Sequence, residues 1–355
     1  MNTIINSFSK YKKILITGGA GFIGGTLVRK LLIETNSIIY NLDKLSYCSS
    51  LESINQLIKD KNIDNKRHIL MNIDLESIEN TNESLRIADP DIIFHLAAES
   101  HVDRSIKDAS GFIKSNIIGT YNLLESANKH YKNLEPKRKR FFKLMHISTD
   151  EVFGSVEGEN KFNEDSKYKP NSPYSASKAS SDHLVRAWYE TYGLPSIITN
   201  CSNNYGPWQY PEKLIPVIIL NALEGEAIPI YGDGKNIRDW IHVDDHVKGL
   251  IQVSISGEIG ETYCLGGSNE INNLDLANLI CEKIDKVLKK VNSKKDLIKL
   301  TEDRPGHDKR YAINSDKVKE KLNWSPSLNF DKGLEQTINW YMNNKKWCKN
   351  IKGLD

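Results

Sequence analysis

The 355-residue sequence predicts an α/β fold in which a doubly wound parallel sheet is followed by a smaller mixed α/β domain. Two observations support this prediction. Short apolar segments alternate with amphipathic stretches of helical period through residue 205, and the first segment runs directly into a glycine-rich turn. Strands that alternate with helices form βαβ units, whose strands are parallel and whose crossovers are right-handed.

Six strands are expected in the first part of the chain. Each is an apolar run of strand length that ends in polar or turn-forming residues. The first strand leads into a helix over 22–33, and a second long helix is expected over 113–130. The expected strands cover 13–17, 38–42, 68–73, 91–96, 143–148 and 196–200.

The pattern changes after residue 205, where Tyr205-Gly206-Pro207 and Tyr210-Pro211 are turn signals. We therefore expect one domain over 12–205 and a second, mainly over 206–350, with the stretch 237–268 as the part that could return to the first sheet. In this second part, strands are expected at 228–231 and 262–265, and helices at 214–224, 243–254 and 273–289.

Composition argues against several classes of partner. The net charge is +2, so no global field favours nucleic acid, and the basic run Lys137–Arg140 is interpreted as a solvated loop. No apolar run is long enough to cross a membrane, and residues 1–13 contain no secretory signal pattern. The cysteines are five in number and dispersed, which favours reduced thiols and a cytoplasmic location.

Gly18, Gly21 and Gly24 lie between the first strand and the first helix. Glycine lets the backbone turn sharply and approach a pyrophosphate at the helix N-terminus, so this context predicts a dinucleotide site. Asp43 ends the second strand, where a carboxylate would accept hydrogen bonds from ribose hydroxyls and repel a 2′-phosphate, which favours NAD over NADP. Lys44 could oppose that preference. Asp74, after the third strand, is either an adenine contact or a turn residue.

Tyr174 and Lys178 are spaced i and i+4, which places them on one face of a helix. A nearby ammonium and a positively charged nicotinamide ring would lower the pKa of the phenol, so that it could act as a base. After a glycine turn of this kind, the pair is typical of short-chain dehydrogenases. Thr149, at the end of the fifth strand, would hydrogen-bond the reacting hydroxyl, because ligands of doubly wound sheets bind at the carboxyl ends of strands.

Asp150 and Glu151 follow Thr149 directly. Elimination of water needs one group that protonates the leaving hydroxyl and another that removes a proton from carbon. Two adjacent carboxyl groups supply that pair, provided that their surroundings separate their pKa values. The alternative is that they only cap the next helix.

Eight segments together resemble the dTDP-glucose 4,6-dehydratase family, within the extended short-chain dehydrogenases of the NAD-dependent epimerase/dehydratase group. The resemblance covers about residues 12–341, and its narrower motifs are the Thr-Asp-Glu triplet, NNYGP, PEKLIP and DRPGHD. The segments are GGAGFIG (18–24), HLAAESHVDRS (95–105), STDEVFG (148–154), YSASK (174–178), NCSNNYGP (200–207), PEKLIP (211–216), IYGDGKNIRDWIHVDDH (230–246) and DRPGHDKRYAI (303–313).

The resemblance implies a Rossmann domain with a substrate-binding C-terminal domain, and an internal redox cycle on a sugar nucleotide. Tyr174 would accept the proton of the 4-hydroxyl, Glu151 would remove the proton on carbon 5, and Asp150 would protonate the 6-hydroxyl as water leaves. NAD would take hydride from carbon 4 and return it to carbon 6. A 4-keto-6-deoxy sugar nucleotide results, with rhamnose or another 6-deoxyhexose as the expected end product. The family also implies a homodimer that pairs through helices near 113–130 and 174–192.

The resemblance also implies two sets of binding residues. The NAD contacts would be Phe22, Ile23, Asp43, Lys44, Leu45, Ser46, Asp74, Leu75, Leu96, Ala97, Ala98, Ser100, Ser115, Tyr174, Lys178 and Asn204. Leu75 and Ser115 depart mildly from the residue types usual at these positions. The dTDP-glucose contacts would be His101, Thr149, Asn203, Lys213, Leu214, Pro229, Ile230, Tyr231, Arg238, Asn269, and the segment 303–307 with Asp303, Arg304 and His307.

Three other interpretations compete with the dehydratase. His242 and His246 could resemble a metal pair, but capping aspartates at a helix start explain them better, and no metal is expected. A related epimerase or decarboxylase shares most motifs, yet an epimerase transfers hydride without losing water and does not need Asp150 and Glu151. A protein that senses NAD without chemistry would usually lack the Tyr174 and Lys178 pair.

Overall fold

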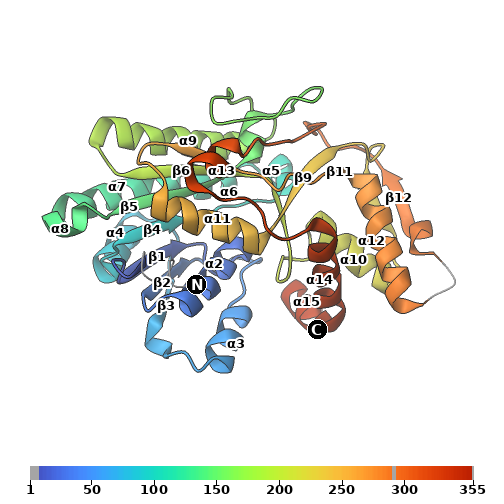
Figure 1. The fold of residues 1–355 in the computed structure, drawn as a ribbon, viewed down its shortest axis with the longest axis horizontal. Helices are drawn as coiled ribbons and strands as arrows, with labels where there is room; N and C mark the ends of the chain where they lie inside the picture. The colour runs from blue at the N-terminus through green and yellow to red at the C-terminus, as the bar shows by residue number, and fades with distance from the viewer. Residues whose placement is uncertain (1–7, 290–292, 354–355) are drawn as a thin grey trace.

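The protein is described here by a computed structural model that covers residues 8–289 and 293–353. Part of the N-terminal stretch considered for a secretory signal, and residues 290–292 of the second expected domain, lie outside these ranges. Figure 1 shows a sheet with helices on both faces, and the later elements α10, α12, α14 and α15 gathered beside it.

All six expected strands lie in one seven-stranded sheet, in which every neighbouring pair is parallel. The seventh strand comes from 262–265, so part of the later chain does return to the sheet. The doubly wound parallel fold predicted from the sequence is therefore confirmed. In spatial order the strands are β10 (Thr262–Leu265), β6 (Ser196–Cys201), β5 (Lys143–Thr149), β4 (Ile92–His95), β1 (Lys13–Thr17), β2 (Ile38–Asp43) and β3 (His68–Asn72).

Alternate residues of β1 pack into two separate cores. Ile14 and Ile16 face a core that includes Leu31 of α2 (Phe22–Glu34) and Leu250 of α11 (Val243–Ser256). Leu15 faces the opposite core, formed with α4 (Ile78–Ala88), α7 (Gly119–Asn133) and α9 (Pro173–Tyr192). Because both faces are covered, the strands are apolar throughout.

The helix expected over 113–130 is present: a π-helical stretch over Ile113–Ile118 continues directly into α7, and α6 (Ser110–Phe112) extends it at the N-terminal side. The basic run expected as a loop instead forms the short helix α8 (Pro136–Lys139), where Arg138 bonds the carboxylates of Asp89 and Asp91. The remaining helices of this part are α3 (Glu52–Asp60) and α5 (Val102–Lys107), with 3-10 turns at Asn65–Arg67 and Asp150–Phe153.

Residues 8–11, ahead of the first strand, contribute to the first core. Phe8 and Tyr11 are fully buried, and their rings meet edge to face with centroids 5.4 Å apart. The hydroxyl of Ser37 donates to the Tyr11 carbonyl oxygen at 2.6 Å. This segment therefore belongs to the folded domain.

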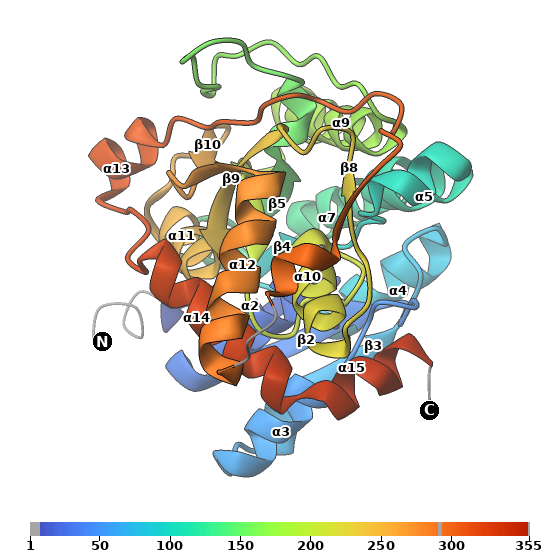
Figure 2. The same cartoon turned by 90° about the vertical axis from the view of Figure 1, so that its right-hand side faces the viewer.

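The C-terminal elements form two small sheets around a third core. β9 (Ile237–His242) lies between β7 (Asn203–Tyr205) and β11 (Glu270–Asn272), so the 237–242 part of the stretch thought able to return to the first sheet does not do so. β8 (Ile228–Tyr231) pairs with β12 (Ile298–Thr301), and Figure 2 shows these elements from the side. The helices around this core are α10 (Leu214–Glu224), α12 (Asn273–Leu288), α14 (Phe330–Asn343) and α15 (Lys345–Lys352), with a 3-10 turn at Lys294–Leu297. α13 (Asp316–Leu322) instead contributes Val318 and Leu322 to the first core.

The third core contains residues from β7, β8, α10, α12 and α14 and is separate from the cores of the large sheet. We therefore propose that the domain boundary lies near residue 205, with 243–265 belonging to the first domain.

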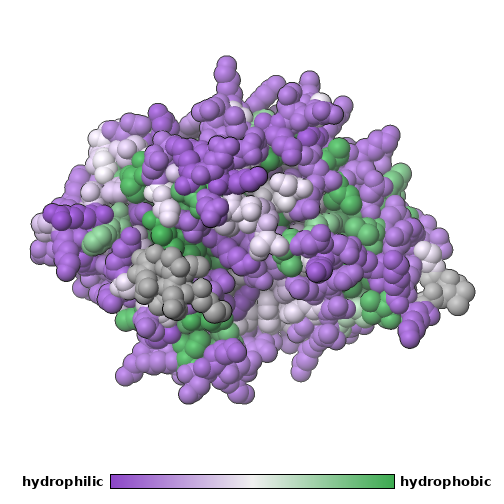
Figure 3. Space-filling model, in the orientation of Figure 1, coloured by the Kyte–Doolittle hydropathy of each residue, from purple (hydrophilic) through white to green (hydrophobic). Residues whose placement is uncertain are grey.

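Among the described residues, no helix is both long and apolar enough to cross a membrane. The face shown in Figure 3 is largely hydrophilic, with apolar side chains in separate small patches.

Candidate active site

A cleft opens where the carboxyl ends of β1, β2, β4, β5 and β6 meet, as expected for a doubly wound sheet. It brings together the glycine turn, Thr149 and Glu151, the Tyr-Lys pair and the start of the second domain, whereas Asp150 is buried and does not line it. Of the predicted NAD contacts, all except Leu45 line it, namely Gly18, Gly21, Phe22, Ile23, Gly24, Asp43, Lys44, Ser46, Asp74, Leu75, Leu96, Ala97, Ala98, Ser100, Ser115, Tyr174, Lys178 and Asn204.

The glycine turn packs so closely against neighbouring backbone that a side chain would not fit at Gly18 or Gly24. Gly18 has φ +72°, and a Cβ there would lie 2.7 Å from the nitrogen of Ala97. A Cβ on Gly24 would lie 2.1 Å from the carbonyl oxygen of Gly18. The turn can therefore pack tightly ahead of the N-terminus of α2, which fits a dinucleotide pyrophosphate.

The Asp43 carboxylate is fixed at the cleft by three hydrogen bonds. Oδ2 accepts from the nitrogen of Ala20 at 2.9 Å, and Oδ1 accepts from the nitrogen of Leu45 and the hydroxyl of Ser49 at 2.8 and 2.9 Å. Leu45, with φ +53°, supports this carboxylate through its backbone and does not line the cleft.

Lys44 is surrounded by acid groups. Its Nζ lies 3.7 Å from Asp74, 3.9 Å from Glu76 and 3.7 Å from Glu99. Three carboxylates already neutralise this ammonium, so it is poorly placed to attract a 2′-phosphate. Asp74 also accepts from the nitrogen of Glu76 at 3.0 Å, as a turn residue would, while its side chain lines the cleft.

Tyr174 and Lys178 are positioned by a strongly capped helix. Ser172 and Ser175 form a capping box at the start of α9, Pro173 occupies the first turn, and Gly193 ends the helix in a left-handed conformation. Lys178 donates through Nζ to the carbonyl oxygen of Ile147 at 2.8 Å, which ties the helix to β5.

The protein itself does not lower the pKa of Tyr174, contrary to the expectation from the nearby ammonium. Burial raises this pKa well above its ordinary value, and the carboxyl groups of Glu151 and Asp150 and the thiol of Cys201 raise it further. The hydrogen bond with Thr149 acts in the opposite direction and lowers it.

Asp150 and Glu151 begin a 3-10 turn that Thr149 caps, because the Thr149 hydroxyl accepts from the nitrogen of Glu151 at 3.3 Å. The acids themselves are therefore not the caps. Oδ1 of Asp150 accepts from Thr149 at 3.3 Å, and Oδ2 is buried without a hydrogen-bond partner. A buried oxygen of this kind can face a substrate hydroxyl.

The two acids differ in their electrostatic surroundings. Burial raises the pKa of Asp150 well above its ordinary value, and Glu151 and Asp239 raise it further, against Arg238. Burial also raises the pKa of Glu151, but Arg304, Arg238 and Lys213 all lower it. Asp150 is thus favoured as the proton donor and Glu151 as the proton acceptor.

Three predicted substrate residues, Lys213, Arg238 and Arg304, therefore converge on Glu151. Nζ of Lys213 donates to the carbonyl oxygen of Ser100 at 2.7 Å. The Arg238 guanidinium donates to the Asp308 carbonyl oxygen at 2.9 Å and lies over the Tyr311 ring. Buried guanidinium groups near a cleft suit a diphosphate.

A second group of predicted substrate residues gathers around Asp103. Its carboxylate accepts from the Tyr231 hydroxyl at 3.1 Å and lies 3.5 Å from Arg304. His307 contacts both the Tyr231 ring and the Asp303 carboxylate. Asp103 was not singled out from the sequence, although it lies inside the HVDRS motif.

The other predicted substrate contacts are arranged differently. Asn203 lines the cleft, whereas His101 does not and lies 3.8 Å from Glu212, which does. Ile230 is 1% exposed and belongs to the third core, so only its backbone could reach a ligand. Asn269 donates its amide to the carbonyl oxygens of Gly267 and Trp240, and Leu214 and Pro229 lie outside the cleft lining.

Sequence reasoning missed a group of cleft residues around Glu212. Glu212 accepts from the Tyr47 hydroxyl at 2.7 Å, and the Arg104 guanidinium lies 3.6 Å from the centre of the Tyr47 ring. Loop sequence alone carries no signal for such contacts between distant segments. The missed lining residues are Leu42, Cys48, Ser49, Ile73, Glu99, Ile147, Ser148, Cys201, Ser202, Gln209, Tyr210 and Glu212.

His242 itself caps α11: its Nδ1 accepts from the nitrogen of Asp244 at 3.3 Å, while Nδ1 of His246 pairs with Oδ1 of Asn204 at 2.9 Å. The expectation of capping aspartates is therefore wrong, and Asp244 and Asp245 lie in the first turn of the helix. Within residues 8–289 and 293–353, no cluster of His, Cys, Asp and Glu has the form of a metal site.

Comparison with known proteins agrees with this site. The family model for GDP-mannose 4,6 dehydratase matches residues 15–337. The dTDP-glucose 4,6-dehydratase of Salmonella typhimurium is 50% identical over 352 residues, which cover 96% of this chain and 95% of the relative.

Two solved structures are similar over almost the whole chain. The dTDP-glucose 4,6-dehydratase DesIV from Streptomyces venezuelae, with NAD and TYD bound, is 38% identical with a TM-score of 0.86 and covers 96% of this chain and 99% of its own. The dTDP-glucose 4,6-dehydratase from Bacillus anthracis, in complex with NAD, is 41% identical with a TM-score of 0.81 over the same shares. The chain therefore belongs to the dTDP-glucose 4,6-dehydratase family.

Proposed function

We propose that this protein converts dTDP-glucose to dTDP-4-keto-6-deoxyglucose and water, with NAD as a cofactor that is regenerated in each cycle. One observation carries the proposal: a buried acid, Asp150, and a half-buried acid, Glu151, with different electrostatic surroundings lie beside Thr149 and Tyr174 at the end of β5. An epimerase transfers hydride without eliminating water and has no use for this pair.

NAD fits the cleft because the glycine turn lines it at the N-terminus of α2, where a pyrophosphate would bind, and Asp43 lines it near the place expected for the ribose. When bound, NAD supplies a hydride acceptor for carbon 4 of the sugar and a hydride donor for carbon 6. Lys178 would hold the nicotinamide ribose from α9. The NADP alternative is disfavoured by Asp43 and by the three carboxylates around Lys44.

Each proton transfer of the reaction is then carried out by a different residue of the chain. Tyr174, hydrogen-bonded by Thr149, accepts the proton of the 4-hydroxyl. The resulting 4-ketone acidifies the proton on carbon 5, which Glu151 removes while three cations stabilise its carboxylate. Asp150 donates a proton to the 6-hydroxyl as water leaves. Glu151 returns a proton to carbon 5 when carbon 6 is reduced. Tyr174 then releases the proton it accepted and Asp150 takes one up, so the chain ends the cycle as it began.

The substrate would lie with its diphosphate near Arg238 and Arg304 and its base near Tyr231. We also propose that the product serves deoxysugar synthesis, with dTDP-rhamnose as the expected end product. All five cysteines are unpaired, which supports a cytoplasmic location.

The direct test is a mass-spectrometric assay of the purified protein with dTDP-glucose and a catalytic amount of NAD. We expect each sugar nucleotide to lose one water with no net formation of NADH. An unchanged mass together with a galactose epimer would contradict the dehydratase and favour an epimerase. UDP-glucose, assayed in parallel, measures how strongly the site selects the base.

Replacing Asp43 with Ala is expected to raise the Kd for NAD by about tenfold, since a hydrogen bond to a charged group contributes about 1.5–3 kcal/mol. Discrimination against NADP should fall as well, because the repelling charge is gone. Calorimetric titration with both cofactors checks this. Asp64→Ala removes an exposed capping carboxylate from the turn before β3 and serves as the control. Unchanged cofactor preference would mean that another group recognises the ribose.

We further propose a homodimer formed through α7 and α9. Ile113, Ile118, Tyr121 and Tyr192 are 50%, 44%, 42% and 48% exposed on these neighbouring helices and the π-helical stretch before α7. Trp188 links Tyr121 and Tyr192 by edge-to-face contacts, so the apolar side chains form one surface. A second copy would cover such a surface.

Ile118→Glu should convert the dimer to a monomer in sedimentation experiments, because it buries a charge at the proposed interface. Val287→Glu, on an equally exposed apolar residue of α12, is the matched control and should leave the mass unchanged. A wild-type protein that sediments as a monomer at micromolar concentration would contradict the proposal.

A further inference from the structure

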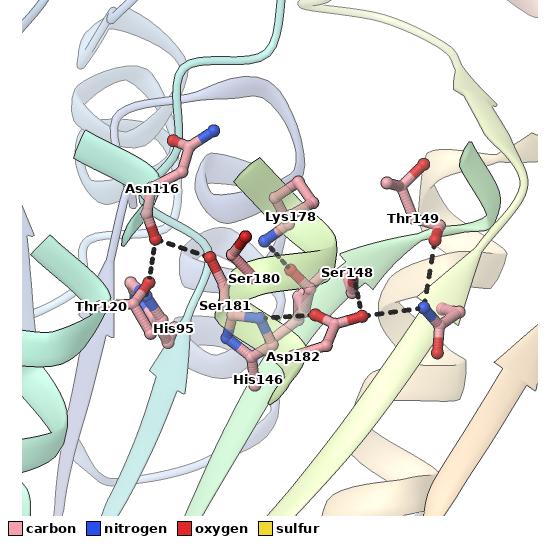
Figure 4. A network of polar contacts seen from close by, with 12 residues as sticks. His95, Asn116, Thr120, His146, Ser148, Thr149, Lys178, Ser180, Ser181 and Asp182 are labelled. Carbon is pink, nitrogen blue, oxygen red and sulfur yellow. Dashed lines mark hydrogen bonds and ion pairs between the residues drawn. The ribbon is translucent and has the colours of Figure 1, made fainter. Parts of the chain in front are cut away.

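Asp182 lies one helical turn after Lys178 on α9, and its carboxylate is buried beneath the catalytic strand end (Figure 4). It does not line the cleft. Oδ1 pairs with Nε2 of His146 at 3.0 Å. Oδ2 accepts from Ser148 and Tyr168 hydroxyls at 2.8 Å each and from the Asn200 amide at 3.3 Å.

These contacts identify Asp182 as an ionised carboxylate. Four groups donate to it. Only the ionised carboxylate can accept with both oxygens, because neither oxygen then carries a proton. Burial lowers the pKa of His146, so this ring is neutral and donates from Nε2, while its Nδ1 has no partner. Although burial raises the pKa of Asp182, His146, Lys178 and Ser148 lower it overall. The charge of Asp182 is therefore permanent at neutral pH.

The same carboxylate holds the strand end that carries the catalytic residues. Ser148 donates to it directly, and the Asn200 amide that contacts it also donates to the Thr149 carbonyl oxygen at 3.1 Å. Lys178 donates to the neighbouring carbonyl oxygen of Ile147. Three consecutive residues at the end of β5 are thus fixed by Asp182 and by the lysine one turn before it.

We propose that Asp182 is a positioning residue for the dehydratase reaction: it balances the buried charge of Lys178 and fixes the strand end that presents Thr149. This inference rests on the proposed function. Burial lowers the pKa of the Lys178 ammonium, and the negative charge of Asp182 opposes that effect. The other groups that face the pair are His95 from β4, His146 from β5, Tyr168 from the loop before α9, and Cys201 from β6.

Asp182→Asn tests the charge while keeping the shape, because His146 can change tautomer and accept a hydrogen bond from the new amide. Without the carboxylate, Lys178 should lose its proton at lower pH. NAD affinity, measured by calorimetry, should fall at alkaline pH as Lys178 loses its proton. We expect this fall to occur about one pH unit lower in the variant. With dTDP-glucose, kcat should fall at least about tenfold and KM should stay the same, since the substrate does not contact this residue.

Tyr168→Phe is the matched control, since it removes one hydrogen bond from the same oxygen without changing the charge. It should leave the pH dependence of NAD affinity unchanged. The proposal would be overturned if Asp182→Asn kept the wild-type pH dependence of NAD affinity and the wild-type kcat. If Asp182→Asn does not fold, Asp182→Glu retains the charge and should keep the alkaline fall at its wild-type pH; a downward shift there would also overturn it. The NAD titration remains informative even if the wild type fails to dehydrate dTDP-glucose, so the two proposals can fail separately.

Discussion

Replacing Tyr174 with Phe is expected to abolish the first oxidation and to lower turnover by about 10³-fold, within the range usual for removal of a catalytic acid or base. The variant keeps the ring and its edge-to-face contact with Phe112, with centroids 6.3 Å apart, so the pocket should keep its shape. It lacks the only group positioned by Thr149 to accept the proton of the 4-hydroxyl. Mixing the NAD-loaded variant with dTDP-glucose in a single-turnover experiment should therefore give no absorbance from reduced nicotinamide.

Tyr205→Phe provides the comparison for this experiment. It also removes a buried hydroxyl, which donates to the Phe330 carbonyl oxygen at 3.4 Å in the third core, away from the cleft. Its oxidation step should proceed as in the wild type. If Tyr174→Phe formed reduced nicotinamide at the normal rate, another residue would have to be the base.

The sequence predicted the large sheet well because each of its strands is a short apolar run followed by a change of period. It could not predict the second domain in the same detail. β7 has only three residues, and β9 continues from a glycine-rich loop, so neither has a strong pattern of its own. Both strands depend on each other for pairing. The π-helical stretch at Ile113–Ile118 was missed because the sequence there has ordinary helical period.

The catalytic residues and the glycine turn could be identified from sequence because each set is local, within one turn or one helix face. Their electrostatics could not. The raised pKa of Tyr174 comes from burial and from acids on a different element, and Arg238 and Arg304 reach Glu151 only through the tertiary fold. Phe8 gave no signal either, since a single aromatic residue outside a periodic segment does not indicate burial.

Asp150→Asn and Glu151→Gln should slow elimination much more than oxidation, by about 10²-fold or more. Both variants keep Tyr174, so the 4-keto form of the sugar nucleotide and reduced nicotinamide should accumulate after substrate is added. They differ in one respect that heavy water can detect. Asp150→Asn retains Glu151 and should still exchange the proton on carbon 5, whereas Glu151→Gln should lose that exchange.

Glu157→Gln changes an exposed acid shortly after the same strand end and should turn over normally in this experiment. If both variants of the triplet dehydrated dTDP-glucose at the wild-type rate, the assignment of the two carboxyl groups would be wrong. If Glu151→Gln still exchanged the proton on carbon 5 and Asp150→Asn did not, Asp150 would be the base and Glu151 the acid.

The raised pKa of Asp150 also predicts how stability depends on pH. Because the folded protein holds this proton more tightly than the unfolded chain does, the group stabilises the fold below the ordinary aspartate pKa, about 3.9, and this contribution is lost as pH rises toward the folded-state value. The amide in the Asp150→Asn variant stays neutral throughout, so the Tm of this variant should exceed that of the wild type by a margin that grows from about pH 5 to about pH 8. Thermal unfolding of both proteins across that range, with Glu157→Gln as the control, measures the margin. A constant difference would show that Asp150 is already ionised in the folded protein. An ionised carboxylate has no proton to donate, so Asp150 could not then serve as the acid.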